Sequence, residues 1–530
     1  MEPGVEKSVI RRRLSRRFEA WKVIEGALVG LTAGIVVTLY RVVLSQAERL
    51  LRAVTQFATT SPMGMLYHVG MLVLLFAVVI FLVRWEPDSA GSGIPQTEGE
   101  VAGFVSMSWW RVLVAKFLGG AAVTAAGLSL GREGPSVQLG GVCGKAVARL
   151  LGKERGEERL LVTCGAASGM SAAFSAPLTG VMFAFEEIHH VMSGPLVVSV
   201  MFSSVIADFV ASRVLGMRPV LSFPIVAEMP LGRHYLLVLA IGVVAGLLGA
   251  LHNAGMFASQ EISARIEGRA PLLVLALSFL LAGVFAHVFP EITCGGDEMI
   301  GLLEIGRTPV GLLMVLLVGK YLFTCLCFGS KAPGGTLFPM VAMGAVIGLV
   351  FGELASTYLG VDPSYLNYFV VLGIVGLFSG AVRAPVTSVV MAFELTGSLN
   401  TLLAAVLVSV TAFVASEVMG VEPFYEKLYA DLAIARAGVE DDSLPTSRRN
   451  VRTHVVEPGS DVEGKTLAEI GWPEEAHVIN IARGGVDIVP RGSTRLMALD
   501  EILVSMGVSN EHQTEERIKE LVRSNIGVKR

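Results

Sequence analysis

The chain has 530 residues, of which 53% are hydrophobic and only 17% are charged, whereas a soluble protein has roughly 25% charged residues. Its formal net charge is −4 and its mean hydropathy is +0.63. These values exclude an ordinary soluble enzyme, a disordered protein and a protein that binds nucleic acid through a basic surface.

The first 23 residues are basic, with seven lysines and arginines against three glutamates. Positive charges that precede a first membrane span favour the cytoplasmic side. We therefore expect residues 1–23 to be a cytoplasmic segment rather than a signal peptide. The chain is predicted to cross the cell membrane several times, with both termini in the cytoplasm.

Residues 24–435 contain repeated apolar runs of about the 20 residues that a helix needs to cross a bilayer. The uncharged runs include Ala53–Val83, His234–Gln260, Ala270–Pro290, Ala332–Gly352 and Pro363–Val382. They predict a multi-pass helical membrane domain. Other apolar stretches are short or interrupted by glycine and proline, which is typical of transporters and channels whose helices do not fully cross.

Three glycine-rich breaks lie beside apolar runs and each ends in proline: Gly91–Pro95 (GSGIP), Gly131–Pro135 (GREGP) and Gly334–Pro339 (GGTLFP). Proline suits the first turn of a helix, so each break predicts a loop followed by a helix N-terminus. A helix start presents free N–H groups and about half a positive charge. Three such starts at membrane depth would bind an anion without a buried lysine or arginine.

An internal repeat appears when the chain is shifted by 208 residues. Gly165–Glu187 and Gly373–Leu395 are identical at ten of 23 positions, where unrelated apolar sequences would share about two or three. The membrane part is therefore predicted to consist of two related halves, about 24–215 and 233–435. Identity alone does not decide whether the halves are parallel or inverted.

These motifs, with the tyrosine of GVEPFYEKL at 420–428, resemble the CLC family of chloride channels and proton/chloride antiporters over about residues 24–435. The resemblance implies an all-α polytopic membrane protein with an inverted repeat and broken helices, assembled as a homodimer with one anion pathway per subunit. It implies no cofactor for transport. The residues that it assigns to the anion are the hydroxyls of Ser92 and Tyr425 together with Gly91, Gly93, Ile94, Arg132, Gly134, Thr336, Leu337 and Phe338.

Two glutamates are candidates for proton transfer. A charged side chain near the middle of a bilayer costs about 2.5–3.5 kcal/mol, so Glu133 is predicted to be functional. The resemblance implies that Glu133 is the external gate and proton acceptor and that Glu187 transfers protons internally. In the repeat, Glu186 aligns with Glu394, which predicts a shared structural role, whereas Glu187 aligns with Leu395. An acid at position 187 favours exchange, since channel members of the family generally lack it.

Two positions leave questions open. Leu337 stands where the family usually has phenylalanine, and Phe338 follows it, so the width of the pathway and its anion selectivity stay undecided. The serine at position 92 favours chloride over nitrate.

Lys116 lies within an apolar helical run, where it either faces the interior and influences the anion pathway or extends toward the membrane surface.

The composition changes near residue 436. We expect a linker at 436–452, a small α+β domain at 453–510 and a charged terminal helix or tail at 511–530. Val456–Gly507 resembles the TrkA-C regulatory domain of potassium-uptake and potassium-channel gating proteins. The resemblance implies a dimerising domain that binds a small effector. A nucleotide or a cyclic dinucleotide is the candidate, although no residue identifies it and a domain that only stabilises a dimer stays open.

The tail has short strands separated by turn residues. The expected elements are strands at His454–Val456, His477–Arg483, Val486–Pro490 and Leu499–Met506, a hairpin turn at Gly484–Gly485, a helical turn at Leu467–Ile470 and a terminal helix at Glu511–Ser524.

The sequence therefore predicts a secondary-active chloride/proton antiporter regulated by its cytoplasmic tail. A passive chloride channel gated by voltage or pH, and a membrane sensor that has lost transport, remain alternatives. The predicted partners are chloride, protons, the lipid bilayer and a second copy of the chain, through both of its domains, but no nucleic acid. An enzyme is not predicted, because we find no nucleophile–base pair and no metal cluster in the sequence.

Overall fold

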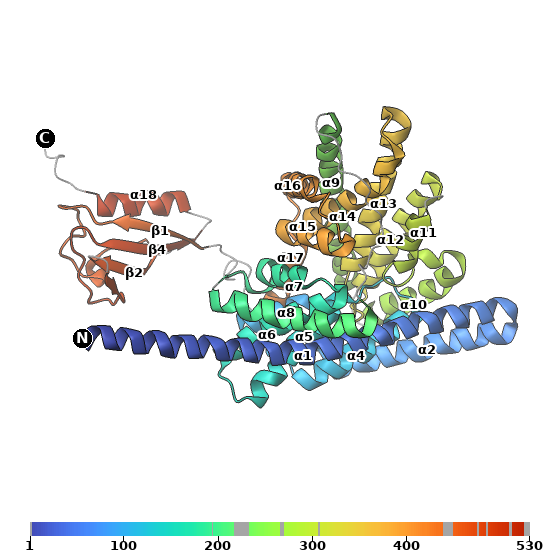
Figure 1. Cartoon of the computed structure of the whole chain (residues 1–530), viewed down its shortest axis with the longest axis horizontal. Coiled ribbons are helices and arrows are strands. Elements are labelled where there is room, and N and C mark those ends of the chain that lie inside the picture. Colours follow the sequence, from blue (N-terminus) through green and yellow to red (C-terminus); the bar gives the residue numbers. More distant parts are fainter. Residues whose placement is uncertain are drawn as a thin grey trace. The chain divides into compact units, whose positions relative to one another are not determined.

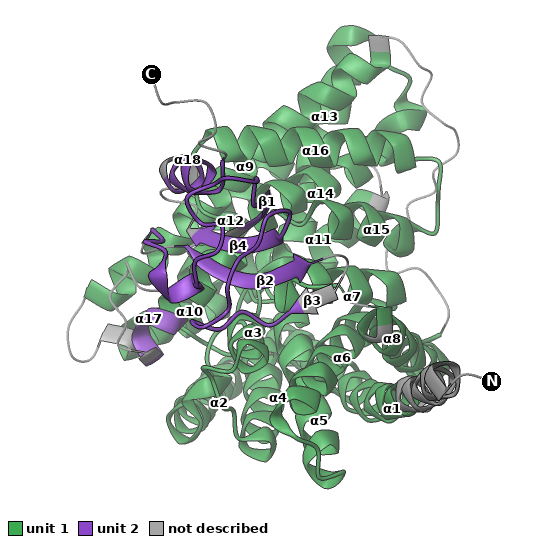
Figure 2. Ribbon diagram, turned by 90° about the vertical axis from the view of Figure 1, so that its left-hand side faces the viewer, with its two compact units in different colours: residues 1–432 green, residues 433–530 purple. Residues whose placement is uncertain are grey.

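The computed structural model describes residues 3–192, 194–216, 233–265, 270–305, 308–437, 449–473, 476–483, 486–507 and 511–523. It divides into two compact units, Met1–Leu432 and Ala433–Arg530 (Figure 2). The first unit is helical, whereas the second contains a β-sheet with a terminal helix (Figure 1).

The first half of the helical unit begins with the longest helix of the described residues, which continues without a break through the basic N-terminal segment. Its helices are α1 (Pro3–Thr60), α2 (Pro62–Trp85), α3 (Ile94–Ala102), α4 (Trp109–Ala126), α5 (Glu133–Leu150), α6 (Arg155–Phe174), α7 (Pro177–Phe183) and α8 (Gly194–Leu215). A 3₁₀ turn at Pro87–Ser89 precedes α3, and a π-helical turn at Ala184–His189 follows α7.

The second half repeats this series of long and short helices. It contains α9 (Arg233–Arg265), α10 (Ala270–Val288), α11 (Asp297–Ile305), α12 (Val310–Gly329), α13 (Leu337–Leu359), α14 (Leu366–Val382), α15 (Pro385–Thr396), α16 (Leu402–Val418) and α17 (Phe424–Ala437). Single 3₁₀ turns lie at Pro290–Ile292 and Pro363–Tyr365.

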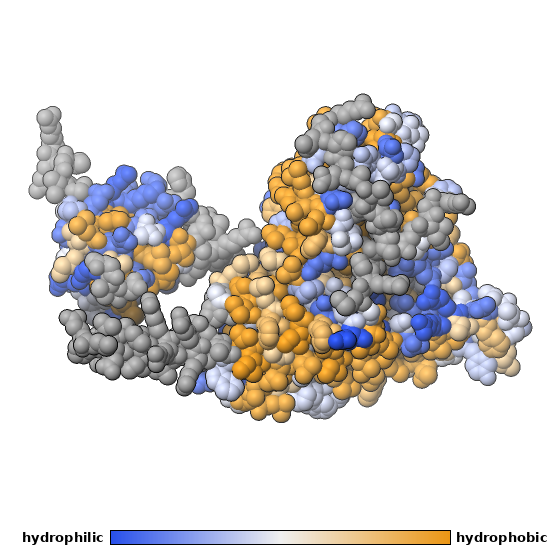
Figure 3. Space-filling view, viewed as in Figure 1, coloured by the Kyte–Doolittle hydropathy of each residue, from blue (hydrophilic) through white to orange (hydrophobic). Residues whose placement is uncertain are grey.

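Seven helices in the described part of the chain are long and apolar enough to cross a bilayer. They are α1 from Trp21, α2, α8, α9, α12, α13 and the segment Pro363–Val382 that contains α14. Apolar residues also cover much of the visible face of the helical unit (Figure 3). Such a surface is stable in lipid rather than in water, which agrees with a multi-pass membrane protein.

The apolar run Ala53–Val83 does not form the single span that its length predicts. α1 ends at Thr60, and α2 begins at Pro62. The Ser61 side chain accepts a hydrogen bond from the Gly64 N–H at 3.0 Å. A serine cap followed by proline starts a new helix, so these two residues divide one apolar run between two helices.

Glycines let the central helices pack with their backbones in contact. In the first half, a Cβ on Gly140 would collide with the Gly165 carbonyl oxygen of α6. In the second half, a Cβ on Gly373 would collide in the same way with the Gly344 carbonyl oxygen of α13. The two helix pairs, α5 with α6 and α13 with α14, thus use the same packing. This similarity supports the predicted duplication.

The two halves are related by inversion. α7 and α15 are equivalent helices of the repeat, and they pack against each other. Glu394, near the end of α15, binds the first turn of α7, whereas Glu186, just after α7, binds the first turn of α15. The two helices therefore run antiparallel, which answers the question that sequence identity left open.

The second unit contains β1 (Arg449–Val455), β2 (His477–Arg483), β3 (Val486–Ile488), β4 (Glu501–Gly507) and α18 (Glu511–Val522). The sheet has the order β1-β4-β2-β3, and every neighbouring pair is antiparallel. Val456, Ile481, Ile502, Val504 and Ile518 contribute to its core. β2 has its predicted bounds, whereas the Gly484–Gly485 turn lies outside the described residues.

Candidate functional site

The three glycine-rich breaks meet at one place. Gly131 and Gly335 exchange two backbone hydrogen bonds, of 2.6 and 2.9 Å. Gly91 donates to the Lys331 carbonyl and accepts from the Gly334 N–H, both at 3.0 Å. Segments separated by more than 200 residues in sequence are thus joined by their backbones.

A helix begins at each break, as the sequence predicts. α3 begins at Ile94, after Gly93, whose φ of +96° favours glycine. α5 begins at Glu133 and α13 at Leu337. The start of α17, with Tyr425 in its first turn, is the fourth helix start among the candidate residues. Together they supply free N–H groups and partial positive charge from several directions.

Gly134 allows two of these helix starts to approach closely. A Cβ built on Gly134 would lie 2.5 Å from the Ser92 hydroxyl oxygen and 2.7 Å from the Ser92 carbonyl oxygen. A larger residue would therefore displace Ser92. This contact places the GSGIP serine directly against the first turn of α5.

Among the buried side-chain oxygens that have no hydrogen-bond partner within the described part of the chain, four belong to the candidate site: Ser92 Oγ, Glu133 Oε1, Thr336 Oγ1 and Tyr425 Oη. Buried polar atoms without partners are uncommon in proteins, because each has lost its hydrogen bonds to water. A group of them beside helix N-termini is the arrangement expected of an ion-binding site.

Glu133 is fully buried, and its side-chain carboxylate lies at the N-terminus of α13. Its Oε2 accepts a hydrogen bond from the Phe338 N–H at 3.2 Å, and its Oε1 lies 3.9 Å from Arg132 Nε. A Cβ on Gly131 would collide with Glu133 Oε2, so glycine makes room for the carboxylate. The carboxylate therefore occupies a position that suits an anion.

Arg132 lies beside this carboxylate rather than beside the serine or tyrosine hydroxyls in the contacts that are described. Its guanidinium is 3.9 Å from Asp297 Oδ1, and its Cζ lies 5.1 Å from the centre of the Phe338 ring. These contacts hold the arginine at the Glu133 end of the site. Phe338, which follows Leu337 in the GGTLFP motif, lines the same small cavity as Arg132 and Glu133.

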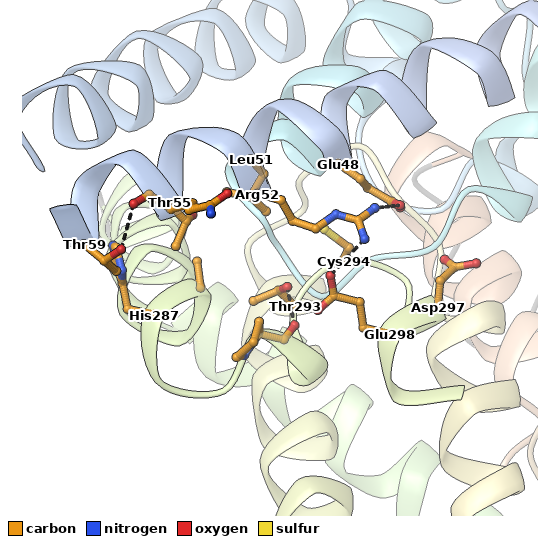
Figure 4. A pocket seen from close by; sticks show the side chains of 13 residues that line it. Glu48, Leu51, Arg52, Thr55, Thr59, His287, Thr293, Cys294, Asp297 and Glu298 are labelled. Carbon is orange, nitrogen blue, oxygen red and sulfur yellow. Dashed lines mark hydrogen bonds and ion pairs between the residues drawn. The ribbon is translucent and has the colours of Figure 1, made fainter. Parts of the chain in front are cut away.

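A cavity of about 270 Å³ is lined by residues of α1, α10, α11 and the loop before α11 (Figure 4). Arg52 lies between Glu298, at 3.3 Å, and Glu48, at 3.9 Å. Glu48 and Asp297 also line the smaller cavity that contains Glu133, Arg132 and Phe338. The two cavities thus share a charged wall that sequence reasoning did not identify, since α1 and α11 are far apart in the chain.

Glu187 lies on the π-helical turn and is 8% exposed. The carboxyls of Glu98 and Glu426 interact electrostatically with it. Glu98 Oε1 lies 3.0 Å from His190 Nε2. The sequence analysis did not predict that Glu98, Glu187 and Glu426 lie near one another. The two glutamates of GSGIPQTEGE are unusual in a buried helix and could have drawn attention to Glu98.

Two buried lysines hold the loops before α3 and α11. Lys116 Nζ donates to the carbonyls of Ser89 at 3.0 Å and Gly91 at 2.7 Å. Lys116 therefore faces the interior, which decides between the two orientations that the sequence left open. Lys320, on the equivalent helix of the second half, donates to the Cys294 carbonyl at 2.8 Å. Alignment of the two halves could have revealed Lys320.

The paired glutamates have the shared structural role that the repeat predicts. Glu394 accepts hydrogen bonds from the N–H groups of Leu178 and Thr179, at 2.8 and 2.7 Å. Glu186 accepts from Val386 and Thr387, at 3.1 and 2.7 Å. Each carboxylate thus caps a helix of the other half.

Comparison with known proteins gives two family matches. A model described as voltage gated chloride channel matches residues 74–417, and a TrkA-C domain model matches residues 451–519. The H(+)/Cl(-) exchange transporter ClcA of Vibrio cholerae serotype O1 is 33% identical over 438 residues, which are 80% of this chain and 92% of that protein. ClcA of Yersinia pestis bv. Antiqua is 33% identical over 68% of this chain and 77% of its own.

Solved structures agree with these matches. A slow cyanobacterial Cl⁻/H⁺ antiporter has a TM-score of 0.74 and 26% identity, over 79% of this chain and 99% of its own. A eukaryotic CLC transporter has a TM-score of 0.65 at 20% identity, over 84% of this chain and 78% of its own, and so shares the fold.

Proposed function

Because this chain belongs to the voltage-gated chloride channel (CLC) family, we propose that it is a secondary-active chloride/proton antiporter of the cell membrane. The similar proteins that carry the names exchange transporter and antiporter support exchange rather than passive conduction. The observation that carries the proposal is the Glu133 carboxylate, which accepts the Phe338 N–H at a helix start that suits an anion.

In the proposed pathway, backbone N–H groups and hydroxyls bind the anion through their partial positive charges. Chloride binds between the starts of α3, α5 and α13 and accepts hydrogen bonds from the hydroxyls of Ser92 and Tyr425. N–H groups and hydroxyls attract an anion more weakly than a full positive charge does, so chloride can also leave. Both hydroxyls are buried and without a partner among the described residues, which supports this role.

The proposed coupling is a competition between chloride and the Glu133 carboxylate. Ionised, the carboxylate occupies the start of α13. Protonated, it is neutral, its attraction to the helix N-terminus weakens and chloride takes its position. Glu187 supplies the proton from the opposite side. Tyr425 is in electrostatic range of both glutamates, which supports a route past the anion site.

The test is proton movement in liposomes under a chloride gradient, with the voltage clamped by an ionophore. Wild-type protein is expected to drive protons uphill. Glu187→Gln is expected to abolish proton flux while chloride still moves, and Glu157→Gln, a partly exposed control on α6, is expected to keep both. Chloride flux without coupled protons in the wild type would make the protein a passive channel.

We further propose that the protein is a homodimer with both termini in the cytoplasm, and that a small ligand binding to the second unit regulates transport. The match to the TrkA-C model supports a regulatory role for this unit. Chloride flux with and without added nucleotides or cyclic dinucleotides tests regulation. Unchanged flux with all of them would leave the unit a structural role.

A further inference from the structure

A third cavity, of about 410 Å³, lies between α9, α12, α13 and α14. Its lining is apolar except for His252 and Tyr321. None of the residues that line it belongs to the anion site or to the cavities near Glu133. An engineered apolar cavity of about 150 Å³ already binds benzene, so this one accommodates a considerably larger apolar molecule.

The mouth of the cavity is formed by exposed apolar side chains of membrane-spanning helices. Leu251 on α9 is 56% exposed and Val318 on α12 is 51% exposed. The inner wall includes Met343 and Leu377, which are almost completely buried. A molecule dissolved in the acyl-chain region of the bilayer can therefore enter the cavity without crossing water.

The hydrogen bonds around His252 define what the cavity can bind. Asn253 Nδ2 donates to the carbonyls of Ala381, at 2.8 Å, and Glu422, at 3.1 Å, so the amide oxygen faces His252. His252 Nδ1 lies 3.3 Å from that oxygen and must carry the hydrogen. The neutral ring then has an acceptor at Nε2.

His252 Nε2 is buried and has no partner among the residues that the structure describes. The Tyr321 hydroxyl donates to the Leu251 carbonyl at 2.8 Å and does not satisfy it. A water molecule is a poor occupant, because it needs two to four polar partners and the surrounding wall is apolar. An apolar molecule that carries one hydrogen-bond donor would fill the cavity and satisfy His252 Nε2.

This cavity is next to the segment that carries the anion-site tyrosine. The His252 ring lies 5.8 Å from the Phe424 ring, and Phe424 precedes Tyr425 at the start of α17. Asn253 also holds the Glu422 carbonyl in the loop before this helix. A ligand that contacts His252 therefore contacts the support of Tyr425.

We propose that this cavity binds a membrane-dissolved lipid alcohol. The hydroxyl group of the lipid donates a hydrogen bond to His252 Nε2, and its hydrocarbon chain lies among the side chains of α9, α12 and α13. The alcohol differs from an ordinary acyl chain because only the alcohol satisfies the buried acceptor.

The experiment compares two photoreactive probes on the full-length protein in lipid nanodiscs: a diazirine-bearing hexadecanol and its methyl ether, which lacks the O–H donor. Labelled peptides are identified by mass spectrometry. The alcohol is expected to label peptides of α9 or α12 about 3- to 10-fold more strongly than the ether, which is the effect of one hydrogen bond.

His252→Phe keeps an aromatic ring against Phe424 and is expected to reduce labelling by the alcohol to the level of the ether. Val318→Trp fills the mouth of the cavity and is expected to block labelling by both probes. Leu322→Trp, one turn further along α12 and outside the cavity lining, is the matched control and is expected to label like the wild type.

Equal labelling by the alcohol and the ether would overturn the proposal, as would labelling that survives Val318→Trp. Size-exclusion chromatography of each variant shows whether it is folded, and Val318→Trp provides the test if His252→Phe does not fold. The experiment measures covalent labelling and not ion transport. A negative result would therefore contradict the lipid-alcohol proposal without contradicting the proposed antiport.

Discussion

The Glu133 carboxyl is fully buried, and its Oε2 accepts a hydrogen bond from the Phe338 backbone N–H. Burial disfavours the charge, whereas the N–H and the start of α13 stabilise it. The opposing effects leave both protonation states accessible, which is the property that a gate coupled to protons needs.

Glu133→Gln keeps the shape of the side chain and removes its charge. We expect proton flux to fall by about 100-fold or more, because no titratable group remains at this position. Chloride flux is expected to continue and to lose its dependence on pH. Parallel recordings with proton and chloride electrodes on the same liposomes measure both, and coupled proton flux in this variant would contradict the proposed gate.

Tyr425→Phe removes a hydroxyl that has no hydrogen-bond partner among the described residues, so the loss is expected to fall on the bound anion and not on the fold. We expect the affinity for chloride to fall about 3- to 10-fold. Isothermal titration of chloride into purified protein measures this change. Tyr358→Phe, at an exposed tyrosine, is the control. An unchanged affinity in Tyr425→Phe would exclude the hydroxyl from the anion site.

At the scale of the helices, the short pair α7 and α15 depends on carboxylates from the opposite half. Glu394 also accepts a hydrogen bond from the Thr179 hydroxyl at 2.7 Å, and Glu186 accepts one from Thr387 at 2.6 Å. Each glutamate thus satisfies several donors of a helix end that would otherwise lack partners in the membrane.

Glu394→Gln and Glu186→Gln are each expected to lower the free energy of unfolding by about 1–2 kcal/mol, because a neutral amide is a weaker cap. The midpoint of thermal unfolding in detergent measures the effect. Glu261→Gln removes one partner of an exposed pair with Arg265 and should have little effect. Equal midpoints for all three variants would show that the caps add no stability.

The helix starts were predictable because proline and glycine mark them locally: α3, α5 and α13 begin within the three predicted motifs. The CLC-like fold and the TrkA-C-like domain were also predicted and are confirmed by the family matches.

Local sequence patterns do not predict contacts between segments that are far apart in the chain. Glu48 and Asp297 share a cavity wall only because α1 passes beside α11, and no pattern around either residue indicates this.

The repeat partly replaces such missing information. It correctly predicted a common role for Glu186 and Glu394, although it gave no sign that each caps the other's helix. The functional roles of four residues stay predictions: Ser92, Glu133, Glu187 and Tyr425. The structure gives their positions, whereas their roles in transport are assigned by flux measurements.

At the scale of the whole molecule, the second unit has its own core and its own ion pair, between the buried Asp500 and the partly exposed Arg483. Arg483 Nε donates to Asp500 Oδ1 at 2.7 Å, and the Met497 N–H donates to Oδ2 at 2.8 Å. Burial raises the pKa of the Asp500 carboxyl, but these hydrogen bonds outweigh burial, so the pKa lies below its ordinary value.

A carboxyl whose pKa is lower in the folded chain stabilises the fold above its unfolded pKa, which is about 3.9. This stabilisation is lost as the pH falls through the folded pKa. Asp500→Asn is therefore expected to destabilise the second unit by about 1–3 kcal/mol at pH 7 and to match the wild type at low pH. Hydrogen exchange of β2 and β4 peptides in the full chain measures this difference, and equal exchange at pH 7 would contradict it.

The reciprocal glutamate caps also bear on the origin of the duplication. Two copies of a single half, placed antiparallel, would make both caps with one glutamate and one helix start per copy, since a two-fold contact repeats itself by symmetry. A dimer of single halves, inserted in both orientations, would therefore be closed by the same contact that joins the two halves of this chain. A single chain, unlike such a dimer, can carry different residues at equivalent positions of its halves, as it does with Glu187 and Leu395.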